Sequence, residues 1–377
     1  MFNKKILFAL CLLSIFLSCK KTRYEYHLTF DDNSKFIISL DSLTPPDTRM
    51  IQFFDSGRNS SLRLAMLNFD NQVINLHDVN GKKINELDLF KLDSTSSKIS
   101  GFHFINDDSL LIYSENSRNM KLISCRKNFR PVLLFNLDSL QNNKIGQLDI
   151  RVTSKTPIIY ENGIIYLTGR AMLHNALTSP QSKLVVSAFS FDLHTKKVDF
   201  IPMFNKVWEE RYWHHEQYFV NHTFIPKQHK IIYSLAMKDS IIMYDTQNNR
   251  QSKAGIISEE LGSENDMVPK KISNPSTIGS YDDLVHYLDK PRYGEIIFDK
   301  YREIYYRFVT SGNEKRDTYL IIYNKNLKKI GETKLPENYL SGAGFFLVKD
   351  GLFLRKSEVE GQDEDKIVFK LFKLMKS

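Results

Sequence analysis

The sequence predicts an all-β protein, with a six-bladed β-propeller as the expected architecture and a seven-bladed propeller as the alternative. Two observations lead to this fold. A unit made of an apolar strand, a polar turn and a second short strand recurs along the chain, which is typical of radially repeated sheets. The 377-residue chain also contains 26 Phe and 18 Tyr but few long amphipathic helical patterns, and this composition favours strands.

The first 21 residues have the features of a secretory leader. Lys4 and Lys5 precede the apolar run Ile6–Leu17, which is too short to span a bilayer as a helix. A small residue, Ser18, comes directly before Cys19. This order resembles a bacterial lipoprotein signal peptide, and the resemblance implies cleavage before Cys19 and lipidation of that residue. The expected organisation is a signal peptide at 1–18, a lipidated tether at 19–23 and a single β-propeller domain at 24–377.

The segment after the tether is expected to form a β-hairpin. Tyr24–Phe30 alternates apolar and polar residues, Lys35–Leu40 is a second strand candidate, and the turn-forming cluster Asp31–Ser34 separates them. Pro45-Pro46-Asp47 then interrupts the chain before the repeats begin.

Six copies of the repeating unit can be traced through the rest of the chain. The first five begin with the strands Val73–Asp78, Leu122–Cys125, Val186–Asp192, Ile241–Asp245 and Leu320–Asn324, each followed by a polar turn. The sixth, Ile367–Phe372, runs into the C-terminal end without its second strand. We expect Lys35–Leu40 to supply that strand, because this would close the ring and cover an exposed sheet edge.

Two further stretches carry a resemblance to a known family. Val207–Trp213 and Tyr301–Arg307, together with the Leu-Ser-Cys-Lys end of the leader, resemble an uncharacterised family of Bacteroidetes-type lipoproteins with a domain of unknown function. That family lies within the TolB-like six-bladed propellers, so the resemblance implies the same fold and a cell-envelope location, but no activity.

The residues after Cys19 differ from those of related surface proteins. Surface-exported lipoproteins of such bacteria tend to carry acidic residues at these positions, whereas this chain has Lys20, Lys21 and Arg23. The difference favours the periplasmic face of the outer membrane over the cell surface.

Charge and cysteine content argue against several functional classes. The chain has 52 basic and 44 acidic side chains, but the two signs are interspersed, so we expect a mixed surface and no nucleic-acid partner. Cys125 is the one cysteine that follows Cys19, so no internal disulfide is expected. We expect Cys125 to be a small buried apolar residue, and the protein to be a monomer.

Three long segments are expected to gather on one face of the propeller. Residues 169–183 would connect two strands within a blade, and residues 205–217 and 258–291 would cross between blades; these two kinds of connection share a face. Long loops on a rigid scaffold commonly bind ligands. The candidate ligand-binding residues are Arg170, His174, Trp208, Glu209, Arg211, Trp213, His214, His215 and Arg292.

Two interpretations of these residues stay open. Aromatic planes beside Arg and Glu side chains suit carbohydrate or peptide recognition. Alternatively, Trp208 and Trp213 anchor the crossing by packing against neighbouring blades. Arg307, which lies among aromatic residues in a strand pattern, could bind an anion on the same face or be a paired core arginine.

Common catalytic and metal-binding patterns are missing from the sequence. It contains no Gly-x-Ser-x-Gly, no phosphate-cradling glycine loop and no His-Glu-x-x-His. Adjacent strand residues point to opposite sides, so His214 and His215 do not suit one ion, and we expect no metal and no cofactor. A glycan-active hydrolase or lyase is the alternative function. It would need two acids facing each other across the central channel, with Glu209, Glu210 and Asp283 as the nearest candidates.

The sequence therefore predicts a membrane-tethered envelope lipoprotein. Its propeller would act as a binding or scaffold module for a protein, peptide or glycan partner. No residue is assigned a catalytic role.

Overall fold

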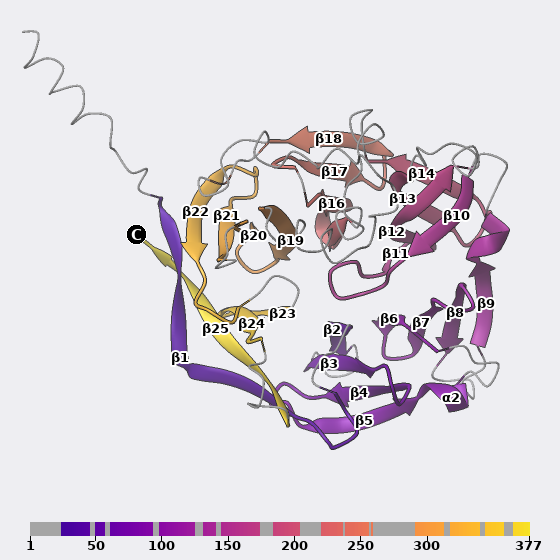
Figure 1. Ribbon diagram of the computed structural model, residues 1–377, viewed down its shortest axis with the longest axis horizontal. Coiled ribbons are helices and arrows are strands. Elements are labelled where there is room, and N and C mark those ends of the chain that lie inside the picture. Colours follow the sequence, from indigo (N-terminus) through magenta and orange to yellow (C-terminus); the bar gives the residue numbers. More distant parts are fainter. Residues whose placement is uncertain are drawn as a thin grey trace, which may run out of the picture.

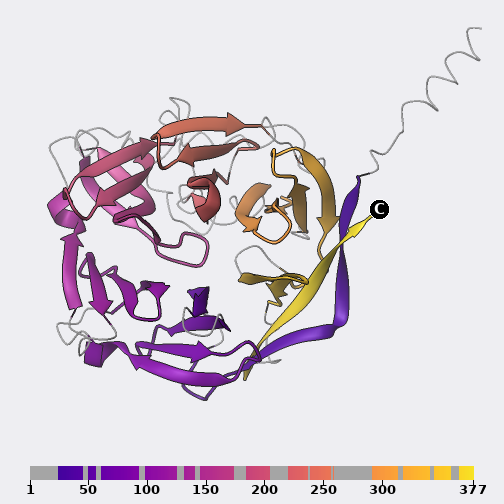
Figure 2. The same ribbon diagram turned by 180° about the vertical axis from the view of Figure 1, so that it is seen from behind.

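The structure, a computed structural model, is an arrangement of β-sheets around a common centre (Figure 1). Seen from behind, the described start of the chain and the C-terminus lie together at the rim (Figure 2). The structure describes residues 24–45, 50–56, 61–92, 98–124, 131–140, 145–173, 184–203, 220–236, 238–255, 258, 291–312, 317–339, 344–357 and 365–377.

Four of the sheets are small, and each follows the chain from the centre outwards. The first contains β2 (Ile51–Ser56), β3 (Ser61–Asn68), β4 (Val73–His77) and β5 (Lys83–Asp88). The second contains β6 (Gly101–Asn106), β7 (Ser109–Ser114), β8 (Asn119–Ser124) and β9 (Pro131–Asn136). The third contains β10 (Ile145–Ile150), β11 (Ile159–Glu161), β12 (Ile164–Leu173), β13 (Leu184–Asp192) and β14 (Val198–Pro202). The fourth contains β15 (Asn221–Ile225), β16 (Lys230–Ser234), β17 (Ile241–Asp245) and β18 (Arg250–Ala254).

The fifth sheet has eight strands and includes both described ends of the chain. Its strand order is β19-β20-β21-β22-β1-β25-β24-β23. The strands are β1 (Tyr26–Ser39), β19 (Arg292–Asp299), β20 (Ile304–Thr310), β21 (Thr318–Tyr323), β22 (Lys329–Lys334), β23 (Phe345–Val348), β24 (Gly351–Arg355) and β25 (Lys366–Lys376).

This topology corrects the expected blade count. The chain forms a propeller-like arrangement of four small sheets and one eight-stranded sheet, so neither the six-bladed nor the seven-bladed propeller is correct. The last two repeating units do not form separate sheets, because the start of β1 pairs in parallel with β22 at Tyr26 and Gly331. Gly331 allows this approach, since a Cβ there would lie 2.2 Å from the carbonyl oxygen of Tyr26.

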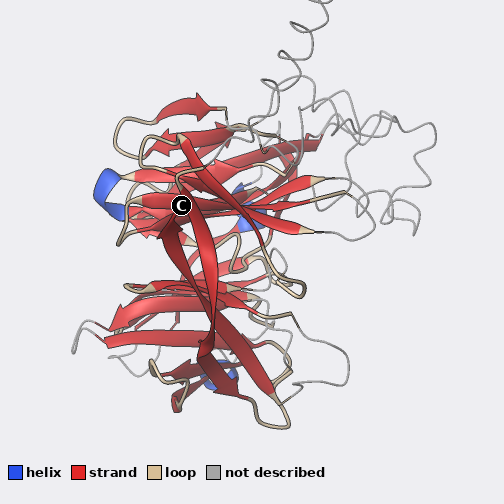
Figure 3. Ribbon diagram, turned by 90° about the vertical axis from the view of Figure 1, so that its left-hand side faces the viewer, coloured by secondary structure: helices blue, strands red, loops and turns tan. Residues whose placement is uncertain are grey.

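The N-terminal hairpin is also corrected, although its second half pairs as expected. Residues 26–39 form one long strand with an irregularity between Asp31 and Lys35, not two strands joined by a turn. Along its length β1 pairs antiparallel with β25, from Tyr26 opposite Lys376 to Ser39 opposite Lys366. The two strands cross the rim as a long twisted ribbon (Figure 3). We call this β1–β25 pairing the seam.

The polar turns predicted after the repeated strands are present where the chain is described, and their side chains explain them. Asp78, Asp192, Asp245 and Asn324 each accept a hydrogen bond from the backbone N–H two residues later, at 2.8–3.0 Å. This Asx-turn geometry ends one strand and starts the return to the next. The turn after Cys125 lies outside the described residues.

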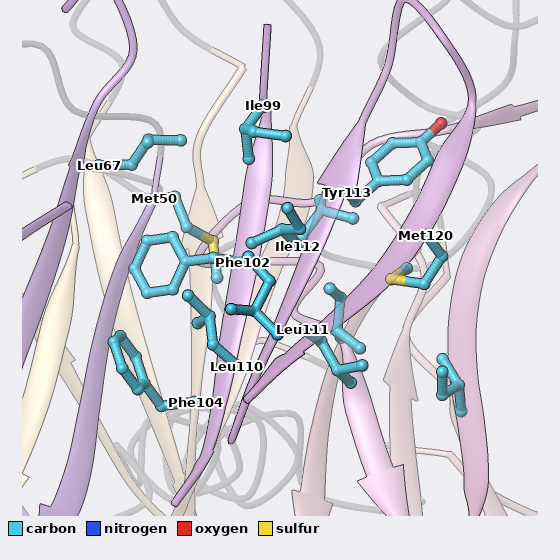
Figure 4. Close-up of a cluster of buried hydrophobic side chains, with 14 of the residues drawn as sticks. Met50, Leu67, Ile99, Phe102, Phe104, Leu110, Leu111, Ile112, Tyr113 and Met120 are labelled. Carbon is cyan, nitrogen blue, oxygen red and sulfur yellow. The ribbon is translucent and has the colours of Figure 1, made fainter. Parts of the chain in front are cut away.

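Apolar side chains fill the spaces between neighbouring sheets. In one cluster, Phe102 and Leu110 of the second sheet pack with Met50 and Leu67, which belong to the first sheet or adjoin it (Figure 4). Phe54 of β2 stacks on Phe104 of β6 with ring centroids 4.4 Å apart. Each small sheet is therefore stabilised by its neighbours, as expected for units too small to bury a face alone.

Helices contribute little to this architecture. The described ones are α2 (Leu89–Leu92) and the 3₁₀ helices η1 (Leu137–Leu140) and η4 (Pro226–Gln228). Within the described ranges, no helix has both the length and the apolar character needed to cross a membrane.

Candidate functional site

The candidate residues chosen from the sequence are not brought together by the described part of the chain. Trp208, Glu209, Arg211, Trp213, His214, His215 and His174 lie outside the described residues, as do Cys19 and Cys125. Arg170 lies in β12 opposite Asp149 and Val186, but only its backbone is described. Arg292 begins β19 opposite Thr310.

Within the third and fourth sheets, the strand ends that flank the long segments lie at the same edge of the sheet. In the third sheet, β12 ends at Leu173 and β14 ends at Pro202, which pairs with Ser187 near the start of β13. In the fourth sheet, β15 begins at Asn221 and β18 ends at Ala254, at the same edge. Most of each long segment lies outside the described residues, so the ligand-binding assignment stays a prediction.

The centre of the molecule holds a feature that the sequence interpretation missed. The innermost strand of the third sheet is split, with Ile150 opposite Gly169 and Ile159 opposite Tyr166 on the same partner strand. Residues 151–158 leave the sheet between these two halves and extend towards the centre (Figure 1). We call residues Arg151–Ile158 the central crossing.

The central crossing contacts the innermost strands of four other units. Ser154 Oγ accepts a hydrogen bond from Ile51 N at 2.7 Å and donates one to Ile51 O at 3.2 Å, on β2. The carbonyl of Lys155 accepts from His222 N at 3.1 Å, on β15. Val152 packs so closely on β6 that a Cβ added to Gly101 would lie 2.3 Å from the Cβ of Val152.

The fourth contact is an ion pair with β19. Lys155 Nζ lies 3.3 Å from Glu295 Oε1, and the two side chains are 39% and 3% exposed. A nearby cation stabilises an acid this deeply buried, because an isolated carboxylate is poorly tolerated away from water. The crossing therefore supplies positive charge to an inner strand of the eight-stranded sheet.

Hydrogen bonds within the crossing fix its shape. The Thr153 and Thr156 side-chain oxygens lie 2.9 Å apart, and Thr156 Oγ1 donates to Arg151 O at 2.7 Å. The backbones of the two threonines also form an isolated β-bridge. The crossing is thus a braced turn rather than an open loop.

A buried histidine locks the crossing onto the fourth sheet. His222 is 5% exposed, its Nε2 lies 2.7 Å from Pro157 O, and its Nδ1 lies 3.3 Å from Thr168 Oγ1. A neutral ring that donates from Nε2 and accepts at Nδ1 satisfies both partners. Burial disfavours the charged form and lowers the pKa of His222 to about 4, although its backbone hydrogen bonds partly oppose this.

A second polar contact joins the first and second sheets. Gln52 of β2 accepts a hydrogen bond from Phe104 N at 2.7 Å and donates one to Phe104 O at 3.1 Å. Its amide nitrogen also lies 3.3 Å from His103 Nδ1. Burial lowers the pKa of His103 to about 4. The side chains of Gln52 and His103 thus hold the inner strands of the first and second sheets together.

Arg307 is a core arginine whose partners are not carboxylates. It is fully buried in β20 and donates to Ser234 Oγ at 2.9 Å and to the carbonyl oxygens of Leu235, Lys238 and Asp239. Its guanidinium carbon lies 3.9 Å from the ring centroid of Tyr293. These contacts tie the eight-stranded sheet to the β16–β17 connection, which supports the core interpretation over anion binding.

The described side chains at the centre have structural roles. Lys155 is paired with Glu295, and His222 is neutral and hydrogen-bonded, so the described centre does not present two facing acids of the kind a glycosidase needs. Across the described ranges, no three His, Cys, Asp or Glu side chains are grouped to hold a metal ion.

Comparison with known proteins identifies relatives of the whole β body. A family model described as a domain of unknown function (DUF4221) matches residues 26–334. A crystal structure of a DUF4221 member from Bacteroides vulgatus is similar with a TM-score of 0.74 and 18% identity, covering 94% of this chain and 100% of that one. A second structure, from Bacteroides fragilis, has a TM-score of 0.50 and 9% identity, with 95% and 98% covered; its description proposes that the protein is exported. No curated protein matches the chain.

Proposed function

The chain belongs to the DUF4221 family, and from this premise we propose that it is a cell-envelope lipoprotein that binds a protein, peptide or glycan partner without chemically changing it. Lipidation at Cys19 tethers it to the outer membrane. The basic residues Lys20, Lys21 and Arg23 favour the periplasmic face over the cell surface. The β body then serves as a rigid scaffold for the long segments.

The observation that carries the proposal is the central crossing. Its residues contact β2, β6, β15 and β19, and its Lys155 pairs with the buried Glu295. A centre occupied in this way suits a scaffold whose partner binds on a face, and it does not suit catalysis by opposed acids. The family relationship supports the fold of this scaffold and carries no activity.

The lipid anchor is tested by labelling. The full chain is expressed in a Bacteroides host with a radiolabelled fatty acid, and Cys19→Ala is compared with wild type. We expect label and vesicle flotation for wild type, and loss of both for the variant. Equal labelling of the two chains would contradict the anchor.

The binding face is tested by substitution in the segment 205–217. A full-length chain that carries both Trp208→Ala and Arg211→Ala is compared with the control variant Arg250→Ala, in which the substituted residue is exposed on β18. Envelope extracts and defined glycan and peptide panels are titrated against each chain. We expect the Trp208→Ala, Arg211→Ala chain to bind the partner at least tenfold more weakly than wild type, and the control to bind it as well as wild type. Unchanged affinity would contradict this site assignment, and turnover of a glycan by wild type would contradict the non-catalytic role.

A further inference from the structure

Three segments meet at the rim where the tether joins the β body. Tyr26 pairs in parallel with Gly331 of β22 and antiparallel with Lys376 of β25. Ser377 N donates to Glu25 O at 2.8 Å. The parallel register places the β21–β22 turn beside the start of β1, near Tyr24, and the C-terminal end of β25 lies on the other side of β1 (Figures 1 and 2).

This part of the rim is basic. Lys325, Lys328 and Lys376 are exposed, and the ammonium group of Lys329 lies 4.5 Å from the ring centroid of Tyr24. Met375, which is 46% exposed, adds an apolar side chain. We call Lys325, Lys328, Lys329, Met375 and Lys376 the tether edge.

Acidic groups neutralise only part of this charge. Glu25 lies 3.7 Å from Lys376, and Glu332 pairs with Lys329. Among the described residues, neither Lys325 nor Lys328 has an ion-pair partner. Two lysines elsewhere on outer strands are paired, Lys83 with Glu86 at 2.6 Å and Lys197 with Asp199 at 2.7 Å. The tether edge therefore carries positive charge that a partner can neutralise.

We propose that the tether edge docks onto an anionic phospholipid surface. The proposal rests on lipidation of Cys19, because five residue steps from Cys19 to Tyr24 reach at most about 18 Å and hold this edge close to the membrane. Lysines within a Debye length of an anionic leaflet are attracted to it, and an exposed methionine can enter the headgroup region. Docking would fix which side of the ring faces the membrane and leave the opposite rim accessible to a partner.

The experiment measures how close two sites on the full lipidated chain lie to a vesicle surface. One fluorophore is attached at Asn326→Cys, in the β21–β22 turn, and another at Val132→Cys in β9, on the opposite side of the ring (Figure 1). Both are made in a Cys125→Ser background. The vesicles contain phosphatidylcholine with or without phosphatidylglycerol, and a headgroup-level quencher lipid.

We expect quenching at position 326 to exceed quenching at position 132 several-fold in the phosphatidylglycerol vesicles, and the excess to fall at high salt. The triple variant Lys325→Glu, Lys328→Glu, Lys376→Glu should remove the excess. A matched variant with Lys82→Glu, Lys227→Glu and Lys253→Glu, three exposed lysines elsewhere, should keep it. Equal melting temperatures confirm that both variants fold.

The outcomes separate the two proposals. A wild-type chain that floats with vesicles but shows equal quenching at both positions overturns the docking while the anchor stands. A chain that neither incorporates lipid nor floats overturns the anchor and the docking with it. An Asn326 probe that is accessible on vesicles but shielded in native envelope membranes assigns the edge to a protein partner and overturns the lipid docking.

Discussion

The seam and the central crossing both join sheets, but they do so with different interactions. The seam is long and has a buried apolar side: β1 and β25 pair along almost their whole length, with one register shift between Asp31 and Lys35, and their side chains Ile38 and Phe369 are fully buried. The central crossing is irregular and largely polar: it reaches β2, β15 and β19 through one or two hydrogen bonds or an ion pair each, and β6 through packing of Val152. Apolar burial supplies most of the free energy of folding, whereas single polar contacts contribute little but specify geometry. We therefore expect the seam to determine whether the β body folds, and the crossing to set how the inner strands lie relative to one another.

The largest expected effect is at the seam. Phe369→Ala removes a fully buried ring whose centroid lies 5.9 Å from that of Phe36 and 5.2 Å from that of Phe346. The cavity should lower the free energy of unfolding by about 3–5 kcal/mol. Urea unfolding measures this loss, with Met375→Ala as the control, because that side chain is exposed on the same strand. Equal losses in the two variants would show that the seam is not a packed interface.

The next effect is a pH dependence at the crossing. The pKa of His222 is about 4 in the folded chain, below its ordinary value of 6.5, so the unfolded chain binds the extra proton between these values. The free energy of unfolding should therefore fall as pH decreases from 6.5 to 4, by up to about 3 kcal/mol from this residue.

His222→Gln isolates that contribution. The variant should lose the part of the slope that comes from His222, while the slope from His103, whose pKa is also about 4, stays in both chains. Urea unfolding at several pH values between 4 and 7 gives both curves. Parallel curves would mean that His222 is not held neutral by the crossing.

A pair of glycine variants sharpens the comparison at the seam. Gly81 and Gly163 both have positive φ angles, +81° and +83°, so alanine introduces similar backbone strain at each. At Gly81 a Cβ would also lie 2.0 Å from the carbonyl oxygen of Ile37 in β1, whereas at Gly163 no atom lies within 4 Å. Gly81→Ala should therefore lower the free energy of unfolding by about 2 kcal/mol more than Gly163→Ala, and lower the melting temperature accordingly. Identical melting temperatures would contradict the close approach of this turn to β1.

The smallest expected effect is at the ion pair of the crossing. Lys155→Met removes the cation 3.3 Å from Glu295, and the half-exposed position of Lys155 limits the loss to about 1 kcal/mol. Lys227→Met, at an exposed position in η4, should change stability by less than half of that. Chemical denaturation of the two variants distinguishes these values, and a larger loss for Lys227→Met would refute the bracing role of Lys155.

Local signals in the sequence were sufficient to predict the repeated strands and the strand that completes the seam. Turn residues such as Asp245 act on backbone groups two residues away, so their effect is visible in a short window. The unit without an outer strand at the C-terminal end implied a partner strand, and β1 occupies that place. The blade count failed because one contact, Tyr26 with Gly331, merges two units across a long sequence separation.

The central crossing could not be predicted in the same way. Ser154 contacts Ile51, and Lys155 contacts Glu295, in strands far away in the sequence, and a serine or lysine in a turn carries no local sign of such a partner. The buried state of His222 likewise depends on where Pro157 and Thr168 come to lie. The tryptophan-rich candidate site follows from side-chain chemistry alone and stays a prediction.

The bracing role of the central crossing is tested most directly by native-state hydrogen exchange of two amides in wild-type protein. Ile51 N and His222 N each donate into the crossing, to Ser154 Oγ and Lys155 O. If the crossing braces the inner strands, both amides should exchange as slowly as the amide of Leu320 in the buried strand β21. Exchange of both amides as fast as that of Val79, in an exposed turn, would contradict the bracing role and the scaffold proposal that depends on it.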